Sequence, residues 1–313
     1  MNGPAIRVQN LDKNFGDVHA VHGFSFELHQ GEIFSLLGPN GAGKTTAIGM
    51  ISGLLKPDTG DVWLMGHSIQ QDAEAAKAQL GVVPQDIALY EDISARANLN
   101  FWGKMYSLRG SELNERVAEV LELVGLEDRA TGAVSKFSGG MKRRLNVGVA
   151  LLHQPRILIM DEPTVGIDPQ SRRRILDSVK QLRDNGVTIL YTTHYMEEAQ
   201  ELSDRIAIMD HGEIIALGTH QELIDIVGEL DRITLTIIGE SAKVKPVWQA
   251  IEGVKKISSE NGTLHLLVTD SNQILPEVFA AASSVGVRIN SVQVQEPNLE
   301  AVFLHLTGRA LRD

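Results

Sequence analysis

The residues best suited to chemistry are Gly38 to Thr45, with the sequence Gly-Pro-Asn-Gly-Ala-Gly-Lys-Thr. They match the pattern G-x-x-x-x-G-K-[ST] in full. The glycines let the backbone curl so that successive N–H groups face the phosphates of a nucleotide, and a following helix adds its positive N-terminal end. We therefore expect Lys44 to reach the β- and γ-phosphates and the Thr45 hydroxyl to ligate Mg²⁺. The predicted nucleotide-binding residues here are Gly38, Pro39, Asn40, Gly41, Ala42, Gly43, Lys44, Thr45 and Thr46.

Two adjacent acids, Asp161 and Glu162, could complete a nucleotide triphosphatase site. They follow Ile157 to Met160, an apolar run that is typical of a buried strand. We expect Asp161 to hold Mg²⁺, largely through water, and Glu162 to polarise the attacking water. Acid pairs also cap strands on ordinary protein surfaces, so this interpretation depends on the phosphate loop.

The segments around these residues predict an α/β core. Ile33 to Leu37 is a compact apolar run before the phosphate loop, and Lys44 to Leu55 has apolar residues at helical spacing after it. Thr188 to Tyr191 is another apolar run, whereas residues 72–132 are mainly helical in pattern and more polar. Strands that alternate with helices in this way predict a largely parallel sheet.

The pattern changes near Gly228, where a smaller α+β domain is predicted to begin. Its expected elements, in the ferredoxin-like order, are a strand near Ile233 to Ile237, a helix at Val247 to Val254, two strands joined by an Asn261-Gly262 turn, a helix at Ile274 to Val285 and a strand at Arg288 to Val294. A last helix from Asn298 is expected to pack on the small sheet. The predicted domains are residues 1–228, with a helical subdomain at about 86–150, and residues 229–313.

Composition excludes several classes of protein. The net charge of −11 argues against a broad basic surface for nucleic acid. The absence of cysteine excludes disulfides, thiolate metal sites and a cysteine nucleophile. The sequence has no apolar run of the roughly 18 residues that a membrane span needs, and we expect no secretory signal at its start.

Further motifs resemble those of the ATP-binding cassette (ABC) family. Lys136 to Met141 is similar to the family signature, and Gly166 to Asp168 to its D-loop. Thr192 to His194 resembles the switch-histidine segment, and Val83 to Gln85 the Q-loop. Phe15 stands where the family places an aromatic residue that stacks on adenine. The motifs occur in the family's order and extend over roughly residues 11–218.

The resemblance implies a role for each of these residues. Ser138, Gly139 and Gly140 open a helix and so offer N–H groups to an anion. The family implies that this anion is the γ-phosphate of ATP held by a second subunit, in a head-to-tail dimer, with a homodimer the simpler arrangement. The implied roles are Glu162 as base, His194 as γ-phosphate sensor, Gln85 as contact to metal and lytic water, and Asp168 as coupler of the subunits. The implied metal-binding residues are Thr45, Gln85 and Asp161.

The signature departs from the usual family sequence. Phe137 replaces leucine and Met141 replaces glutamine, so Met141 cannot make the polar contacts of glutamine. Ser-Gly-Gly-Met followed by Lys142 to Arg144 is, however, similar to the drug- and antibiotic-exporter (type-2) branch. The three basic residues either form a solvated face, or Lys142 or Arg143 has a special role.

Membership of that branch implies a motor for a membrane exporter. The implied partner is a transmembrane permease, which would hold the chain peripherally at the cytoplasmic face of the inner membrane. The aromatic residues between Gln85 and Ser138 either dock on this partner or pack in a helical core; they are Tyr90, Phe101, Trp102 and Tyr106. The alternative is a soluble ABC ATPase that acts on nucleic acid or ribosomes. The acidic charge and the absence of a heptad run between Lys44 and Ser138 disfavour it, so no nucleic-acid partner is expected.

Overall fold

The computed structural model describes residues 3–228, 230–260, 263–295 and 298–309. Contacts divide the chain into two compact units, with the division after His220. The helices formed by the described residues include none that is both long and apolar enough to cross a bilayer.

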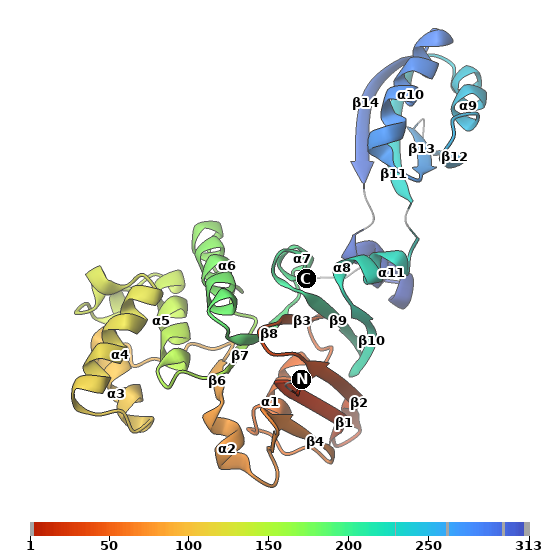
Figure 1. Cartoon of the computed structure of the whole chain (residues 1–313). Coiled ribbons are helices and arrows are strands. Elements are labelled where there is room, and N and C mark those ends of the chain that lie inside the picture. Colours follow the sequence, from red (N-terminus) through yellow and green to blue (C-terminus); the bar gives the residue numbers. More distant parts are fainter. Residues whose placement is uncertain (1–2, 229, 261–262, 296–297, 310–313) are drawn as a thin grey trace. The chain divides into compact units, whose positions relative to one another are not determined.

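A six-stranded sheet forms the centre of the first unit, in the order β10-β9-β3-β8-β7-β6 (Figure 1). Its strands are parallel except for β10, which pairs antiparallel with β9. The predicted strands β3, β7 and β8 are confirmed and entirely buried. The strand bounds are β3 (Ile33–Leu37), β6 (Leu80–Val83), β7 (Ile157–Asp161), β8 (Thr188–Thr193), β9 (Arg205–Asp210) and β10 (Glu213–Gly218).

Strand β6 lies in a stretch whose pattern predicted mainly helix. It pairs with β7 at the edge of the sheet, from Leu80 opposite Ile157 to Val83 opposite Met160. A strand this short contains too little alternation to reveal its period. Its position matters because it ends directly before Pro84 and Gln85.

Both faces of the central sheet are covered, which explains why its strands are continuous apolar runs. Ile157 and Ile159 of β7 belong to one core cluster, and Leu158 and Met160 to another. The first cluster joins the sheet to helix α1 (Lys44–Ile51) and to an antiparallel sheet in the order β2-β1-β4-β5. The bounds of that sheet are β1 (Ile6–Phe15), β2 (Val18–Leu28), β4 (Thr59–Leu64) and β5 (His67–Ser68).

The helices of the first unit form two further groups. Helices α3, α4 and α5 enclose an apolar cluster of their own, and we refer to these three helices as the helical subdomain. Helix α6 packs in the second core cluster. The bounds are α2 (Ala73–Ala78), α3 (Ala95–Met105), α4 (Gly110–Leu123), α5 (Gly139–Leu151), α6 (Pro169–Asp184) and α7 (Met196–Leu202), with short 3₁₀ turns at Glu127–Arg129 and Val134–Lys136.

The interpretation of Lys142 to Arg144 as a solvated face is wrong for two of the three residues. Arg143 is 5% exposed and Arg144 is 8% exposed. The guanidinium of Arg144 donates to the carbonyl oxygens of Val124 and Gly125 at 2.6 and 2.9 Å, at the end of α4. Such partners allow a cation to be buried. Only Lys142 lies at the surface, where it pairs with Glu91.

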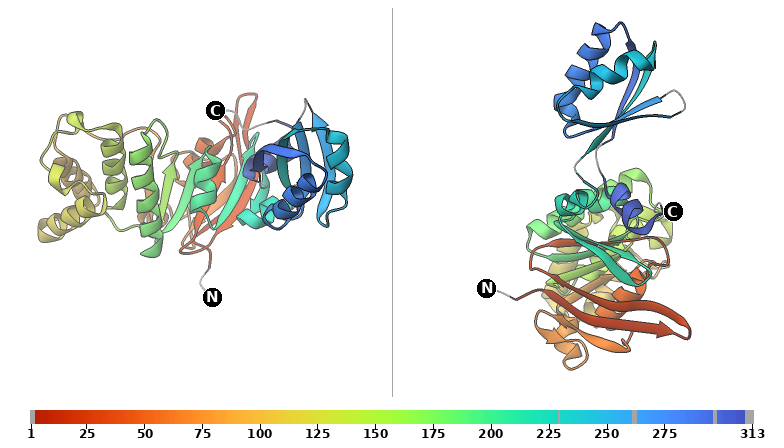
Figure 2. Two further views of the ribbon diagram at one scale, coloured as in Figure 1. Left: turned by 90° about the horizontal axis from the view of Figure 1, so that it is seen from above. Right: turned by 90° about the vertical axis from the view of Figure 1, so that its right-hand side faces the viewer.

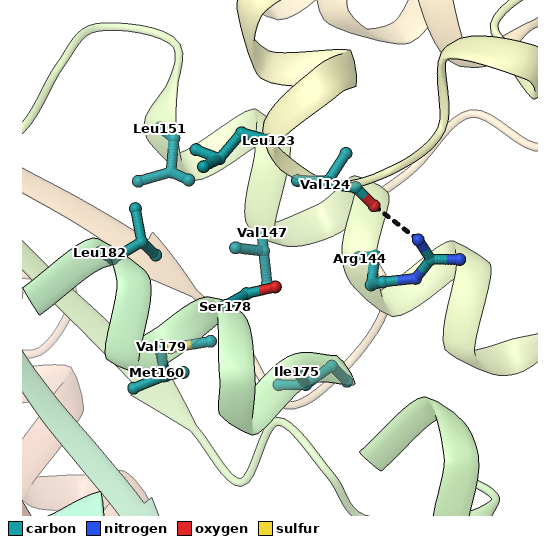
Figure 3. Close-up of a pocket in the computed structure, with 10 residues that line it drawn as sticks. All are labelled: Leu123, Val124, Arg144, Val147, Leu151, Met160, Ile175, Ser178, Val179 and Leu182. Carbon is teal, nitrogen blue, oxygen red and sulfur yellow. Dashed lines mark hydrogen bonds between the residues drawn. The ribbon is translucent and has the colours of Figure 1, made fainter. Parts of the chain in front are cut away.

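A small apolar pocket lies between α4, α5 and α6 (Figure 3). Figure 3 shows Val147 of α5 and Val179 of α6 on its walls, with the Arg144–Val124 hydrogen bond beside it. Its volume of about 10 Å³ is room for no more than one water molecule. This pocket is a packing gap between helices and is too small for a ligand.

The second unit contains a four-stranded antiparallel sheet in the order β12-β13-β11-β14, with α9 and α10 packed in its core (Figure 2). The ferredoxin-like order is confirmed. The first helix covers residues 241–249 and not the predicted Val247 to Val254, since Val254 already begins β12. The predicted Asn261-Gly262 turn lies outside the described residues. The bounds are α8 (His220–Asp225), β11 (Asp231–Ile238), α9 (Ser241–Gln249), β12 (Val254–Glu260), β13 (Thr263–Val268), α10 (Ser271–Ser284), β14 (Arg288–Gln295) and α11 (Leu299–Thr307).

Helix α11 begins where the sequence predicted, with the Asn298 side chain accepting a hydrogen bond from the N–H of Ala301 at 3.0 Å. Its apolar residues Leu299, Val302 and Phe303 are buried. They are not part of the cluster that fills the small sheet, although Ala301 and Leu304 of the same helix line a surface pocket together with Arg232 of β11 and Leu267 of β13. The expectation that the apolar residues of this helix pack in the core of the small sheet is therefore wrong.

Candidate nucleotide-binding site

The phosphate loop connects β3 to α1, and its glycines are required by its shape. Gly41 and Gly43 have φ angles of 83° and 103°, which residues with a side chain rarely adopt. A Cβ at Gly43 would lie 2.4 Å from the carbonyl oxygen of Ala20, and one at Gly38 would lie 2.3 Å from that of Met209. The loop is therefore pressed against its neighbours and leaves its inner side open.

Lys44 is buried at the first position of α1, with 4% of its surface exposed. Its Nζ donates to the carbonyl oxygens of Gly38 and Pro39 at 2.7 and 3.0 Å. It also lies 3.0 Å from Oε1 of Glu162. The carbonyl oxygens and the carboxylate compensate the buried ammonium group and fix it at the inner side of the loop.

The two acids are held at the carboxyl end of β7 by Thr192 of β8. The Thr192 hydroxyl donates to Oδ1 of Asp161 at 2.6 Å and accepts the backbone N–H of Glu162 at 2.9 Å. Glu162 has φ 44°, an uncommon angle for a residue with a side chain. This backbone conformation and the Thr192 hydroxyl together fix the position of the Glu162 carboxylate.

His194 follows β8 and faces the same carboxylate. Its Nδ1 lies 3.3 Å from Oε2 of Glu162, within the distance of an ion pair but without hydrogen-bond geometry. Both side chains are less than 10% exposed. Lys44 and His194 therefore lie against the two different oxygens of Glu162.

An open pocket of about 450 Å³ lies over the loop, and a volume of this size fits a small ligand. Its lining residues are Val18, His19, Ala20, Asn40, Gly41, Gly43, Lys44, Thr45, Thr46, Gln85, Glu162, His211 and Gly212. The pocket thus brings together most of the predicted loop residues with Gln85 and Glu162. Gly38, Pro39 and Ala42 belong to the same loop but do not line the pocket. Asp161 is connected to the site through Thr192, which also bonds Glu162. His194 is connected to it through the Glu162 carboxylate.

Sequence reasoning missed five of the lining residues. Val18, His19 and Ala20 belong to β2, and His211 and Gly212 form the turn between β9 and β10. No motif contains them. Their place follows from backbone packing, since the N–H of Gly212 donates to the carbonyl oxygen of Ala42 at 2.9 Å.

Phe15 is not among the residues that line the pocket. It lies half-exposed at the end of β1, opposite Val18 in the hairpin register. The Nζ of Lys13 lies 5.6 Å from the centroid of its ring. Because Val18 does line the pocket, Phe15 is next to its rim.

Ser138, Gly139, Gly140 and Asp168 also lie outside the described lining of this pocket. Ser138 caps α5, and its hydroxyl accepts the N–H of Met141 at 3.3 Å. Ser138 and Gly139 are exposed, whereas Gly140 is buried against α6, where an added Cβ would collide with the Ser171 side chain. Asp168 is exposed and caps α6, and hydrogen bonds from Ser171 lower the pKa of its carboxyl group.

Helix α5 also holds the backbone on both sides of Gln85. The Arg143 guanidinium donates to the carbonyl oxygens of Pro84 and Gln85 at 2.8 and 2.6 Å. The side-chain oxygen of Asn146 accepts the N–H of Ala88 at 3.2 Å. Burial lowers the pKa of Arg143. The helix that begins with the signature residues thus fixes a segment that lines the pocket.

The sequence matches two known families. Residues 21–165 match the family described as "ABC transporter". Residues 229–307 match the one described as "ATP-binding protein DrrA1-3-like, C-terminal domain".

Three ATP-binding proteins are similar to the chain over almost its whole length. The Linearmycin resistance ATP-binding protein LnrL of Bacillus subtilis (strain 168) is 47% identical, with 98% of this chain and 100% of the relative covered. The Nod factor export ATP-binding protein I of Cupriavidus metallidurans is 40% identical, with 98% and 99% covered. The Daunorubicin resistance ATP-binding protein DrrA3 of Streptomyces coeruleorubidus is 37% identical, with 98% and 97% covered.

Solved structures agree with this grouping. An ATP-binding subunit of an ABC transporter has a TM-score of 0.65 and 28% identity, with 72% of this chain and 93% of the other covered. The ATP-binding cassette MJ0796, solved as a dimer in a post-hydrolysis state bound to ADP and Pi, has a TM-score of 0.62 and 26% identity, with 68% and 98% covered. The chain therefore belongs to the family of ABC transporter ATP-binding proteins, with a C-terminal domain of the DrrA1-3-like type.

Proposed function

We propose that this ABC ATPase is the motor subunit of a membrane exporter, that it acts on Mg²⁺-bound ATP, and that it drives a separate transmembrane permease. The observation that carries the ATPase assignment is the convergence of Lys44, Gln85 and Glu162 on one pocket above a phosphate loop. Full-length similarity to resistance and export ATP-binding proteins supports the exporter branch. The same similarity disfavours a soluble ATPase acting on nucleic acid or ribosomes.

In the proposed hydrolysis, Glu162 takes a proton from the attacking water as general base. Lys44 binds the β- and γ-phosphates, and the N–H groups of the loop bind the remaining phosphate oxygens. His194 contacts the γ-phosphate and supports Glu162. Its location against one oxygen of Glu162 favours this role, because a positioned base is worth roughly 10²–10⁴ in rate.

We assign the Mg²⁺ ion to Thr45, Gln85 and Asp161. Thr45 and Gln85 line the pocket, and both offer the oxygen ligands that Mg²⁺ prefers. The Asp161 carboxylate adjoins Glu162, and one of its oxygens accepts the Thr192 hydroxyl. When bound, the ion neutralises charge that develops on the phosphate oxygens.

We further propose that two copies of the chain form a head-to-tail dimer, each completing the other's site with Ser138, Gly139 and Gly140. Two of these residues are exposed at the positive start of α5, outside the pocket of their own chain. In this arrangement Asp168 would couple the two sites, and Phe15 would stack on adenine at the rim. The dimeric form of the related cassette MJ0796 supports the proposal.

The permease is proposed to dock on the aromatic residues of the helical subdomain. Tyr90, Phe101 and Tyr106 are 50, 39 and 40% exposed, so core packing does not account for them, whereas Trp102 packs against the subdomain core. Tyr90 and Phe101 stack edge to face, with centroids 4.9 Å apart. Docking there would hold the chain peripherally at the cytoplasmic face of the inner membrane. We place the boundary between the cassette (1–228, helical subdomain about 86–150) and the accessory domain (229–313) at Gly228. The match to the C-terminal family begins at residue 229 and supports this boundary, whereas the division by contacts falls earlier, after His220.

The test has two parts. The purified chain should hydrolyse ATP only with Mg²⁺, and a tagged chain should be isolated from detergent-solubilised membranes of its source together with a polytopic protein that lacks its own cassette. Recovery of ribosomes or DNA in place of such a protein would contradict the exporter assignment and leave the ATPase assignment intact. Absence of hydrolysis in the purified chain and in the isolated complex would contradict the role assigned to Glu162.

A further inference from the structure

Glu198 of α7 is a buried acid outside the nucleotide pocket. It is 2% exposed, and its carboxylate accepts hydrogen bonds from three hydroxyl groups. The Thr164 hydroxyl lies 2.7 and 2.9 Å from its two oxygens, the Tyr191 hydroxyl 2.9 Å from Oε2 and the Thr193 hydroxyl 3.0 Å from Oε2. The Nε of Arg172 lies 3.6 Å from Oε1, an ion pair without hydrogen-bond geometry.

Burial of the Glu198 carboxylate carries a large desolvation cost in free energy, which the surrounding donors must offset. The side chain is therefore held in one position. A carboxylate removed from water is tolerated only where donors or cations surround it. Burial, and then the nearby charge of Glu198, raise the pKa of Tyr191 well above its usual value. The phenol therefore keeps its proton and remains a donor.

The groups bound by Glu198 belong to different segments of the site. Thr164 lies two residues after Glu162, in the loop that leads to Asp168. Thr193 directly precedes His194, and its hydroxyl also accepts the N–H of Tyr195 at 3.0 Å.

A second connection runs through Arg172 on α6, the helix that Asp168 caps. Its guanidinium lies 4.5 Å from the centroid of the Tyr195 ring. Tyr195 directly follows His194, so the start of α6 and the histidine segment touch each other and share Glu198 as a partner.

We propose that Glu198 is a positioning residue for ATP hydrolysis, which fixes the loop from Glu162 to Asp168 against the segment that carries His194. It holds the His194 ring beside the Glu162 carboxylate and transmits a displacement of Asp168 to that ring. The inference rests on the proposed function, because it concerns the rate of the hydrolysis assigned to Glu162. It does not require that Glu198 touch the nucleotide.

The decisive variant is Glu198→Gln in the full chain. Glutamine keeps the size of the side chain but places an NH₂ group against hydroxyl donors, which breaks the network. We expect kcat to fall roughly 10- to 100-fold, as for small misplacements of reacting groups. The affinity for ATP, measured with a fluorescent analogue, and the KM should stay within about twofold, because Glu198 does not line the described pocket. Glu198→Asp, which keeps the carboxylate, should recover part of kcat.

Glu201→Gln is the matched control. Glu201 lies on the same helix, is about one-third exposed and pairs with Lys180 at 2.7 Å. The chemical change is identical, but the partners of Glu201 are Arg173 and Lys180 of α6. Neither the loop from Glu162 to Asp168 nor the segment that carries His194 bonds to it, so kcat should stay at the wild-type value. A Glu198→Gln enzyme as active as Glu201→Gln would overturn the inference. A decrease of kcat in Glu198→Gln that is accompanied by decreases of ATP affinity and of melting temperature would also overturn the inference. Such a result would indicate that Glu198 has a structural role alone.

A second variant keeps the test valid if Glu198→Gln does not fold. Thr164→Val removes one hydroxyl donor without changing the shape of the side chain, and it should lower kcat with unchanged ATP affinity. Where both variants fold, the double variant of Glu198→Gln and Thr164→Val should have the same kcat as Glu198→Gln alone, because the two residues act as a unit. Additive decreases in the logarithm of kcat would contradict this expectation. Failure of the proposed function can be distinguished from failure of this inference. In the first case the wild-type chain itself would show no ATP hydrolysis that depends on Glu162, whereas in the second case only the effect of Glu198→Gln would be missing.

Discussion

The Nζ of Lys44 lies 3.0 Å from Oε1 of Glu162, and both side chains are almost completely buried. The lysine of the phosphate loop and the proposed base are thus direct partners. The phosphates of ATP would compete with Glu162 for this ammonium group. Binding of ATP is therefore expected to release the carboxylate for its role at the attacking water.

The first prediction concerns Glu162→Gln. The variant should bind ATP at least as tightly as the wild type, because the phosphates no longer displace a carboxylate from Lys44. Its kcat should fall by about 10²- to 10⁴-fold, since the positioned base is lost. Equilibrium binding and steady-state hydrolysis measure the two quantities separately. Near-normal turnover would show that another group is the base.

The second prediction concerns the stability of the same pair. Lys44→Met should abolish ATP binding and leave the Glu162 carboxylate buried without its ammonium partner. Removal of one partner of a buried ion pair costs about 3–5 kcal/mol in the free energy of unfolding. In the double variant with Glu162→Gln the uncompensated charge is gone, so part of this loss should be recovered. Denaturant unfolding of the wild type, the two single variants and the double variant gives the coupling free energy between Lys44 and Glu162. Strictly additive losses in the free energy of unfolding would contradict the prediction.

The sequence predicted the fold best where one local pattern decides the structure. Ile33 to Leu37 and Ile157 to Met160 are apolar throughout because both faces of the central sheet are covered. The phosphate loop and the acid pair lie at the ends of these strands, so their proximity could be predicted. Asn298 was recognised as the start of α11 because a capping side chain acts within its own turn.

The remaining features depend on contacts that no local pattern reveals. Arg143 is buried because it binds carbonyl groups 58 and 59 residues away, whereas isolated basic residues favour the surface. Glu198 is likewise buried with Thr164, 34 residues away. His19 and Gly212 line the pocket because the turn between β9 and β10 is bonded to the phosphate loop.

The third prediction concerns Arg143→Gln. The shorter side chain cannot reach both Pro84 and Gln85, so their carbonyl groups lose charged donors. We expect the free energy of unfolding to fall by about 1–3 kcal/mol. Amide hydrogen exchange should rise in residues 84–88, and kcat should fall because Gln85 is less well positioned.

Lys142→Gln is the control for this variant. Lys142 pairs with Glu91, which is half-exposed, and such pairs contribute at most about 1 kcal/mol. Hydrogen exchange of residues 84–88 should therefore stay unchanged in Lys142→Gln. Equal exchange in both variants would show that Arg143 does not hold the Gln85 segment.

The fourth prediction concerns Phe101, whose ring is 39% exposed on the proposed docking surface. Phe101→Ala should reduce co-purification with the permease and leave ATP affinity unchanged, because Phe101 does not line the nucleotide pocket. Phe279→Ala is the control, since this ring is 45% exposed on the second unit. Equal recovery of the permease with both variants would exclude Phe101 from the interface. Loss with Phe101→Ala alone, at an unchanged melting temperature, would locate the contact through which hydrolysis reaches the membrane partner.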